Sequence, residues 1–504
     1  MEKSKKYFIV FITVILFLHS IWAFAQNKQK IEFNANSLEF DKSMGENIKR
    51  LIGNVVMWQG KVYIYCDSAH LNSEDNTLIA YSKVHVRQSD TTNLYGDILH
   101  YNGNTKIADI QGNVILKDKQ ITLTTTHLTF DENKNTGIYT TGGKIVDKEN
   151  TLTSTYGYFY SGKNEFYFKK NVVLINPDYV TKCDTLLYNT ATKTSYFLGP
   201  TTIKSDSDFI YCENGWYNSH TDISQFNKNA YLISKEQTIK SDSLFFDRNK
   251  GFGKAIGKVI LIDTLQKITV TGDYSEYYEK TGNLFITGKT FLSQIMEEDT
   301  LFLHADTLKS VSDSTKKHKT LFAYHKAKFF KSDMQGMCDS LVYALSDSII
   351  KLYITPILWS DENQLTAKYT EIRLKNKEIE SIYMNENAFI ISQKDTGRYN
   401  QIKGRNMLGY VKNNQLYKVM VNGNGETIYY VEDDKGLYMG INKAEAANLI
   451  IYLKDKKVKR IKFISKPKAV LHPPKNNDRS NLYLKDFIWH KNKRPLTKLD
   501  ILKY

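Results

Sequence analysis

The residues of this chain that could do chemistry are few and widely spaced. Its cysteines form no C-x-x-C pair and show no Cys/His spacing typical of a zinc site; they are Cys66, Cys183, Cys212 and Cys338. His70, His85 and His100 lie 15 residues apart, but a half-period step in a repetitive sequence explains that spacing without a metal. The motifs H-E-x-x-H, G-x-S-x-G and the phosphate-binding P-loop are absent. We therefore expect no catalytic residue, no metal site and no cofactor.

One acidic position recurs in a motif that reads roughly x-[DN]-[ST]-L-x-[FY]-[DN]. Clear copies begin at Ala35, Cys66, Cys183, Ser241 and Cys338, and weaker copies between them keep a step of 28 to 37 residues. The aspartates are thus spread one per repeat, whereas an enzyme that cleaves polysaccharide needs clustered carboxylates. All four cysteines occupy the first motif position or its equivalent. We expect four small buried thiols, with disulfides between neighbouring repeats as the alternative.

A second landmark with the same step lies between these motifs. Its clearest copies are Gly53-Asn54-Val55, Gly112-Asn113-Val114 and Gly257-Lys258-Val259. Each period contains short runs of Val, Ile, Thr, Tyr and Phe bounded by Gly, Asn, Asp and Lys, which are strand and turn signals. Only residues 442–448 favour a helix. The sequence predicts an all-β fold, an elongated jelly-roll or solenoid-like stack of about 30-residue repeats that forms two facing antiparallel sheets.

Positions three and five of the Gly-Asn-Val unit should point to the same side of a strand. Fifteen of the 18 residues at these positions in nine copies are apolar, and Asp147 is the clearest departure. Such a face is either an ordinary closed core or a groove for acyl chains. The candidate groove residues are Val55, Met57, Val84, Val86, Val114, Leu116, Val172, Leu174, Leu232, Val259, Leu261 and Leu292.

Composition and charge exclude several classes of protein. The 504 residues are 41% hydrophobic and 13% aromatic, too apolar for a disordered chain. A mean hydropathy of −0.44 excludes a polytopic helical membrane protein. The net charge is +15, but residues 451–504 alone hold 16 Lys and Arg against four Asp, a net of +12. A nearly neutral body with a basic end does not indicate a nucleic-acid binder.

Within this basic end we expect Lys491, Lys493 and Arg494 to meet an anionic head group or an acidic partner. A solvated basic tail is the alternative. At the other end, residues 1–25 read as a secretory signal, with Lys3, Lys5 and Lys6 before an apolar stretch and an A-x-A box at 23–25. An uncleaved anchor helix is the alternative. The predicted divisions are this signal, repeats over 26–295, a continuing or second jelly-roll over 296–465, and a basic Pro-containing tail over 466–504.

The export signal, the Gly-Asn-Val strands and the phased Asp-Ser-Leu-x-Phe-Asp strands resemble the OstA-like (organic solvent tolerance) family, which includes LptA and the N-terminal domain of LptD. The resemblance extends over about residues 31–463. It implies a β-jelly-roll, often V-shaped in section, whose interior carries the acyl chains of lipid A. This chain is much longer than an LptA-like subunit and has no segment like the barrel of LptD, so it most resembles the long members without a barrel.

The expected function is that of a non-enzymatic periplasmic lipopolysaccharide carrier, exported by a cleaved signal and associated with outer-membrane biogenesis. By resemblance its partners are lipopolysaccharide, an inner-membrane ABC-transporter complex and an outer-membrane LptD-like translocon. An end-to-end homo-oligomer is a further possibility that the resemblance raises, and nucleic acid is not expected. The alternative is a structural β-solenoid, a spacer or surface adhesin, with a closed core and no lipid.

Overall fold

The computed structural model describes residues 29–503 except 41–42, 44, 89–91, 118–120, 298, 316–317, 377, 413–414, 434, 456 and 474–481. The predicted export signal therefore lies outside the described residues. The chain divides into two compact units: residues 1–206 with 218–220, and residues 207–217 with 221–504. No α-helix occurs in the described part of the chain. Accordingly, no described helix has the length and hydrophobicity needed to cross a membrane.

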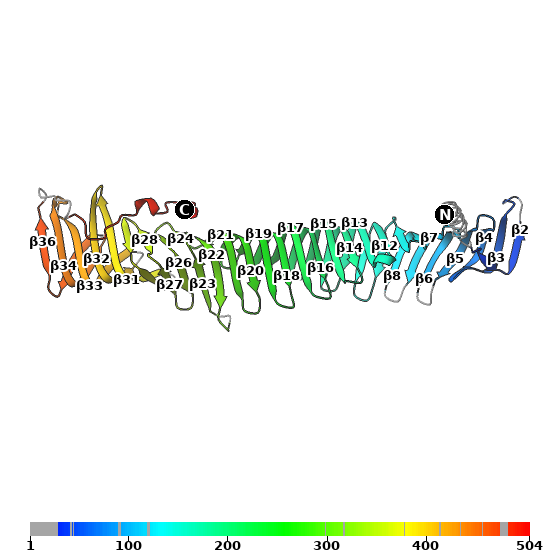
Figure 1. Ribbon diagram of the computed structural model, residues 1–504, viewed down its shortest axis with the longest axis horizontal. Coiled ribbons are helices and arrows are strands. Elements are labelled where there is room, and N and C mark those ends of the chain that lie inside the picture. The colour runs from blue at the N-terminus through cyan, green and yellow to red at the C-terminus, as the bar shows by residue number, and fades with distance from the viewer. Residues whose placement is uncertain are drawn as a thin grey trace, which may run out of the picture. The chain divides into compact units, whose positions relative to one another are not determined.

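Unit 1 consists of strands that follow one another side by side in chain order (Figure 1). Their bounds are β1 (Glu32–Asn34), β2 (Ser37–Phe40), β3 (Ile48–Gln59), β4 (Val62–Asn72), β5 (Thr77–Arg87), β6 (Asn93–Asn102), β7 (Ile107–Lys117), β8 (Thr122–Asp131), β9 (Thr136–Tyr139), β10 (Gly143–Val146), β11 (Thr151–Ser154), β12 (Tyr156–Tyr160), β13 (Glu165–Ile175), β14 (Tyr179–Asn189) and β15 (Thr194–Ser205). A short 3-10 turn, η3 (Ser161–Lys163), joins β12 to β13.

Unit 2 continues the same pattern. Its strands are β16 (Asp208–Asn218), β17 (Ile223–Ser234), β18 (Gln237–Asp247), β19 (Phe252–Asp263), β20 (Ile268–Tyr278), β21 (Asn283–Ile295), β22 (Thr300–Ser312), β23 (Lys319–Tyr324), β24 (Ala327–Phe330), β25 (Gln335–Cys338), β26 (Ser340–Ala344), β27 (Ile349–Tyr353), β28 (Ile357–Ser360), β29 (Asn363–Thr366), β30 (Tyr369–Lys375), β31 (Glu378–Asp395), β32 (Arg398–Lys412), β33 (Gln415–Glu432), β34 (Tyr438–Lys454), β35 (Lys457–Ile464) and β36 (Lys468–His472). Two 3-10 turns, η5 (Lys491–Lys493) and η6 (Asp500–Leu502), lie near the C-terminus.

Each long strand is folded at a corner near its middle. In the β3–β4 ladder Ile52 pairs with Ser68 and Val55 pairs with Cys66, so two residues of β3 face one of β4. The two extra residues, Gly53 and Asn54, have φ of 78° and 47°. Left-handed backbone of this kind bends a strand sharply and favours Gly and Asn. The recurring Gly-Asn pair of the sequence is therefore the corner itself.

The recurring aspartate stabilises the corner from outside. Asn113 at the β7 corner donates through Nδ2 to the carboxylate of Asp97 on β6, at 2.8 Å. At the β5 corner, Ser82 donates to Asp67 at 2.8 Å and Lys83 lies 3.3 Å from the same carboxylate. The hydrogen bond from Ser82, then that from Lys83, keeps the pKa of Asp67 below its ordinary value. One aspartate per repeat thus serves one corner per repeat.

The corner divides each strand between two facing layers that share one core. Leu51 precedes the β3 corner and Met57 follows it, yet both belong to the same buried cluster. The all-β class and the facing antiparallel layers predicted from sequence are confirmed. The prediction of a helix at residues 442–448 is wrong, because these residues lie within β34. There Ala444 and Ala446 are buried and Glu445 is exposed, the period of two that a paired strand requires.

Candidate functional site

The position-five residues, three positions beyond each corner, line up across the strands of unit 1. Pairing from β3 to β15 joins them with residues of the intervening strands in one unbroken row. The row reads Met57, Ile64, Val86, Leu94, Leu116, Leu123, Ile145, Leu152, Leu174, Thr181 and Ile203. Only Thr181 among them is polar. With about 4.8 Å between neighbouring strands, the row is on the order of 50 Å long.

Unit 2 contains a row of the same kind. It runs through Leu232, Ile239, Leu261, Val270, Leu292 and Leu303, and every member is apolar. The structure therefore brings the predicted position-five residues of each unit together. It also adds a partner from each intervening strand that the sequence analysis missed. The sequence contains a signal for these partners, because they lie two residues before the start of the Cys-Asp-Ser motif or its equivalent in each repeat.

Burial differs between the two predicted positions. The position-three residues are closed core: Val55, Val84, Val114, Val172 and Val259 are at most 1% exposed. Among the position-five residues only Met57 is fully buried, at 0%. The others, Val86, Leu116, Leu174, Leu232, Leu261 and Leu292, are half-buried. A ligand could therefore reach this second row, whereas the first row is packing.

The inside of the corner explains the small residues opposite position three. Cys66 pairs with Val55 and Cys183 with Val172, while Gly96 takes the same place opposite Val84. A Cβ on Gly96 would lie 2.6 Å from Ile110, so only small side chains fit in this crease. All four cysteines are buried thiols rather than disulfides. Burial raises the pKa of Cys66, Cys212 and Cys338 to about 12, so these thiols remain protonated at neutral pH.

Asp147 does not interrupt the apolar row. In that repeat the corner lies at Gly142, where φ is 90°, and Ile145 pairs with Leu123 and Leu152. Ile145 is therefore the position-five residue of this repeat. Asp147 lies beyond the strand end, where its carboxylate accepts hydrogen bonds from the backbone N–H groups of 149 and 150. The reading frame of the sequence analysis was wrong by two residues here.

Polar side chains join the two layers at the start of unit 1. The Tyr101 hydroxyl donates to Oε1 of Gln59 across the layers at 2.6 Å, and Gln59 Nε2 donates to the carbonyl of Gly103 at 3.1 Å. Asn76, nearby, accepts from the backbone N–H of Ile31 at 3.0 Å. These bonds close the strand ends over β3–β6, which accounts for the complete burial of Met57.

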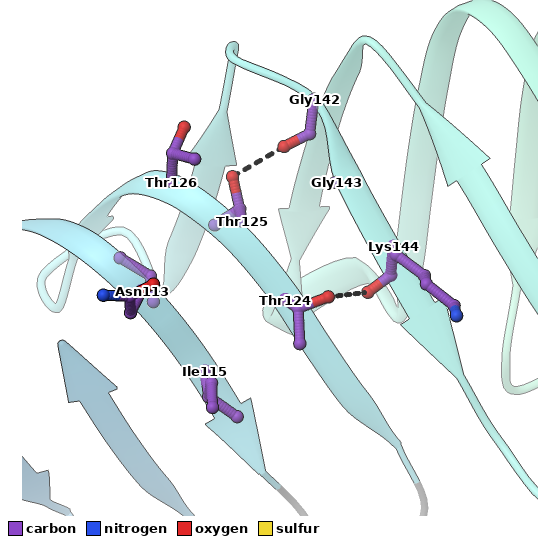
Figure 2. Close-up of a pocket in the computed structure, with 9 residues that line it drawn as sticks. Asn113, Ile115, Thr124, Thr125, Thr126, Gly142, Gly143 and Lys144 are labelled. Atoms are coloured by element: carbon purple, nitrogen blue, oxygen red, sulfur yellow. Dashed lines mark hydrogen bonds between the residues drawn. The ribbon is translucent and has the colours of Figure 1, made fainter.

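A pocket of about 440 Å³ lies at the corners of β7, β8 and β10, and Leu116, Leu123 and Ile145 of the apolar row do not line it (Figure 2). Ile115, Thr124 and Lys144 line it, on β7, β8 and β10. Ile115 stands between the inward-facing Val114 and Leu116 and so points to the opposite side. Thr125 donates to the carbonyl of Gly142 at 2.7 Å within it. This pocket is thus separate from the apolar row.

The basic C-terminal segment is packed against unit 2. Arg494 donates to Gln335 at 2.9 Å and to the carbonyl of Asp361 at 2.7 Å, so it is engaged within the protein. Lys491 and Lys493, the other predicted anion contacts, are exposed. Among the described residues there is no group of three or more His, Cys, Asp or Glu that could hold a metal.

The fold defines a class of all-β proteins in which strands folded at regular corners enclose an apolar interior. Residues 28–184 and 180–242 match the family described as OstA-like protein. This matched part, residues 28–242, is just under half of the chain, and it is similar to the OstA-like family.

A solved structure with detectable similarity is that of LptH from Pseudomonas aeruginosa, described as the LptA-homologous periplasmic component of a lipopolysaccharide transport device. The alignment has 17% identity and a TM-score of 0.19, and covers 21% of this chain and 75% of that one. A comparison with curated proteins gives no match.

Proposed function

We propose that this protein binds lipopolysaccharide in the periplasm and passes it towards the outer membrane. The observation that carries the proposal is the row of almost entirely apolar residues in each unit, in which the position-five residues other than Met57 are half-buried. The match of residues 28–242 to the OstA-like family supports it, since the sequence resembles OstA-like carriers of lipid A. No residue of the proposal is catalytic; the work is done by binding.

In this mechanism acyl chains lie along the row while phosphates and sugars stay in water. Each methylene that leaves water contributes about 0.8 kcal/mol, so a few acyl chains would hold the lipid firmly. A row of near-identical side chains gives neighbouring positions similar affinity. The lipid could then move from strand to strand without a large barrier, and direction would come from a transporter complex at one end and a translocon at the other.

Complete burial of the position-three residues favours a second candidate, a structural spacer or adhesin. Val84, Val114 and Val259 form an ordinary closed core, and the Gln59–Tyr101 bond closes the layers at one end. A spacer needs no more than this. The half-burial of Leu116 and Leu261 is what a spacer leaves unexplained.

Native mass spectrometry of the protein extracted from its own cell envelope separates the two candidates. The carrier hypothesis predicts bound lipopolysaccharide, released as lipid A on mild acid hydrolysis. An envelope protein of unrelated all-β fold, purified in the same way, is the control. Protein that carries no more lipopolysaccharide than this control would favour the spacer.

A further inference from the structure

The C-terminal segment, residues 482–503, is held on one face of unit 2 by glutamine side chains. Gln401 on β32 donates to the carbonyl of Leu482 at 2.8 Å and accepts from the N–H of Leu484 at 2.8 Å. Gln364 on β29 binds the segment in the same way: it donates to the carbonyl of Ile488 at 2.8 Å and accepts from the N–H of His490 at 2.7 Å. The primary amide of each glutamine thus makes the pair of backbone hydrogen bonds that a neighbouring strand would otherwise make with the segment.

These glutamines belong to one cross-strand row, which places them under the path of the segment. Pairing joins Gln335, Trp359, Gln364, Ile391, Gln401 and Ile428, all at most 3% exposed. Apolar contacts complete the attachment: Leu484 is 4% exposed and packs with Phe389, Ile391 and Ile428. Further along, Ile501 is fully buried and η6 contacts β22 and β24. Figure 1 shows the segment, in red, running back across these strands.

The other side of the segment is exposed, apolar and basic. Ile488, Leu496 and Leu499 are 58%, 73% and 59% exposed. Lys485, Lys491, Lys493 and Lys498 are exposed among them. The segment carries six Lys and Arg against two Asp, a net of +4. Both aspartates have lysine partners of their own, Asp486 with Lys403 at 2.8 Å and Asp500 with Lys503 at 2.7 Å.

We propose that this exposed side is a docking surface for a bilayer of anionic phospholipid. Large apolar side chains set among lysines are the chemistry of proteins that bind at a membrane interface, because the side chains enter the head-group region while the lysines meet lipid phosphates. The glutamine clamps fix the segment before binding, so little ordering entropy opposes it. This surface is on the opposite side of the segment from the sheet, and it is independent of the apolar rows that we assign to lipopolysaccharide.

The test is co-sedimentation of the full chain with phosphatidylglycerol–phosphatidylcholine vesicles and with pure phosphatidylcholine vesicles. We expect binding to the anionic vesicles only, weakened by added salt. A lysine near an anionic surface contributes about fivefold in affinity, so Lys491→Ala with Lys493→Ala should weaken binding roughly 20- to 30-fold. Leu496→Ser with Leu499→Ser should weaken it about tenfold or more.

The controls are residues of equal exposure elsewhere in the chain. Leu265 is 70% exposed in the turn after β19, and Leu265→Ser should leave binding unchanged. Lys182 and Lys204 are exposed on β14 and β15, and their double alanine variant matches the charge change. The proposal would be overturned if the wild-type protein did not bind anionic vesicles, or if the control variants lost as much binding as the test variants. Binding to lipopolysaccharide micelles but not to phospholipid vesicles would also overturn it, while leaving the proposed function intact.

Discussion

At the scale of single residues, room inside the corner decides which side chain the repeat can use. Cys66, Gly96 and Cys183 fit inside the corner because they are small enough to leave room for the side chains packed there. A thiol in that place is a small apolar filler. The four buried cysteines are thereby explained without a disulfide.

Reactivity of these thiols with alkylating agents is the first prediction. Burial raises the pKa of Cys66, Cys212 and Cys338 from 9.0 to about 12, so their contribution to stability is complete below pH 9 and is lost as the pH rises towards 12. At pH 8 we expect alkylation about 1000-fold slower than for a free thiol, from the pKa difference alone. Mass spectrometry of iodoacetamide-treated protein measures this, with guanidinium-unfolded protein as control. Rapid labelling of the folded chain would contradict the burial.

At the scale of the elements, the corner is the unit that turns a sheet into two layers. Most corners have two consecutive left-handed residues, Gly142 and Gly199 being single ones, and at β5 and β7 the aspartate of the preceding strand holds the corner from outside. Gly112 shows the constraint: its φ is 74°, and a Cβ there would lie 2.4 Å from Asp97 Oδ2. The corner is therefore sensitive to residues that strands elsewhere tolerate.

The second prediction follows from this geometry. Gly112→Ala should lower the free energy of unfolding of unit 1 by about 1–3 kcal/mol, because it combines a left-handed alanine with a steric clash. Gly137→Ala is the matched control, since φ there is ordinary and the new Cβ meets only Phe130 at 3.6 Å. Urea unfolding of both variants gives the comparison. Equal midpoints would show that the corner does not need its glycine.

The third prediction concerns the clamp that holds the C-terminal segment. Gln364→Ala leaves the carbonyl of Ile488 and the N–H of His490 without their partner, which costs about 1–3 kcal/mol. We expect trypsin to cleave at Lys485, Lys491 and Lys493 several-fold faster than in the wild type, with the strands still protected. Gln225→Ala, in β17 and remote from the segment, is the control. If both variants are cleaved at the wild-type rate, the clamps do not retain the segment.

The sequence predicted the strands and the apolar positions because both are local and repeat with a fixed step. It missed Ile64, Leu94 and Leu123 because apolar positions were assigned only within the Gly-Asn-Val unit and not ahead of the Asp-Ser-Leu motif. It assigned residues 442–448 to a helix because alanine, lysine and glutamate have high helix propensity, which the pairing of β34 with β33 overrides.

The docked C-terminal segment was beyond prediction. Its partners, Gln335, Gln364 and Gln401, lie on three strands and form a row only once the sheet exists. The Gln59–Tyr101 bond is similar, because it joins residues 42 positions apart. Contacts between layers depend on how the strands fold over, and no local pattern encodes that.

At the scale of the whole molecule, each unit has a continuous row of almost entirely apolar residues beside a closed core, and most of the position-five residues of that row are half-buried. That arrangement suits a ligand with long hydrocarbon chains and a head group that stays in water. A closed core alone would make the protein a spacer. The proposed function therefore depends on whether lipid occupies the row of position-five residues in the living cell.

The most direct measurement is site-specific photo-crosslinking in cells that make lipopolysaccharide. A photo-reactive amino acid is placed at Leu116 or Leu261, and in matched controls at the neighbouring Ile115 or Ile260, which are also half-buried but point to the opposite side. Met57 is a fully buried comparison. Asn133 is a suitable exposed control, whereas Asn76 is not, because it is buried.

We predict lipopolysaccharide adducts at Leu116 and Leu261, several-fold above those at Ile115 and Ile260, and few or none at Met57 and Asn133. Equal adducts at inward and outward positions of the same strand would contradict the account, and so would their absence from both.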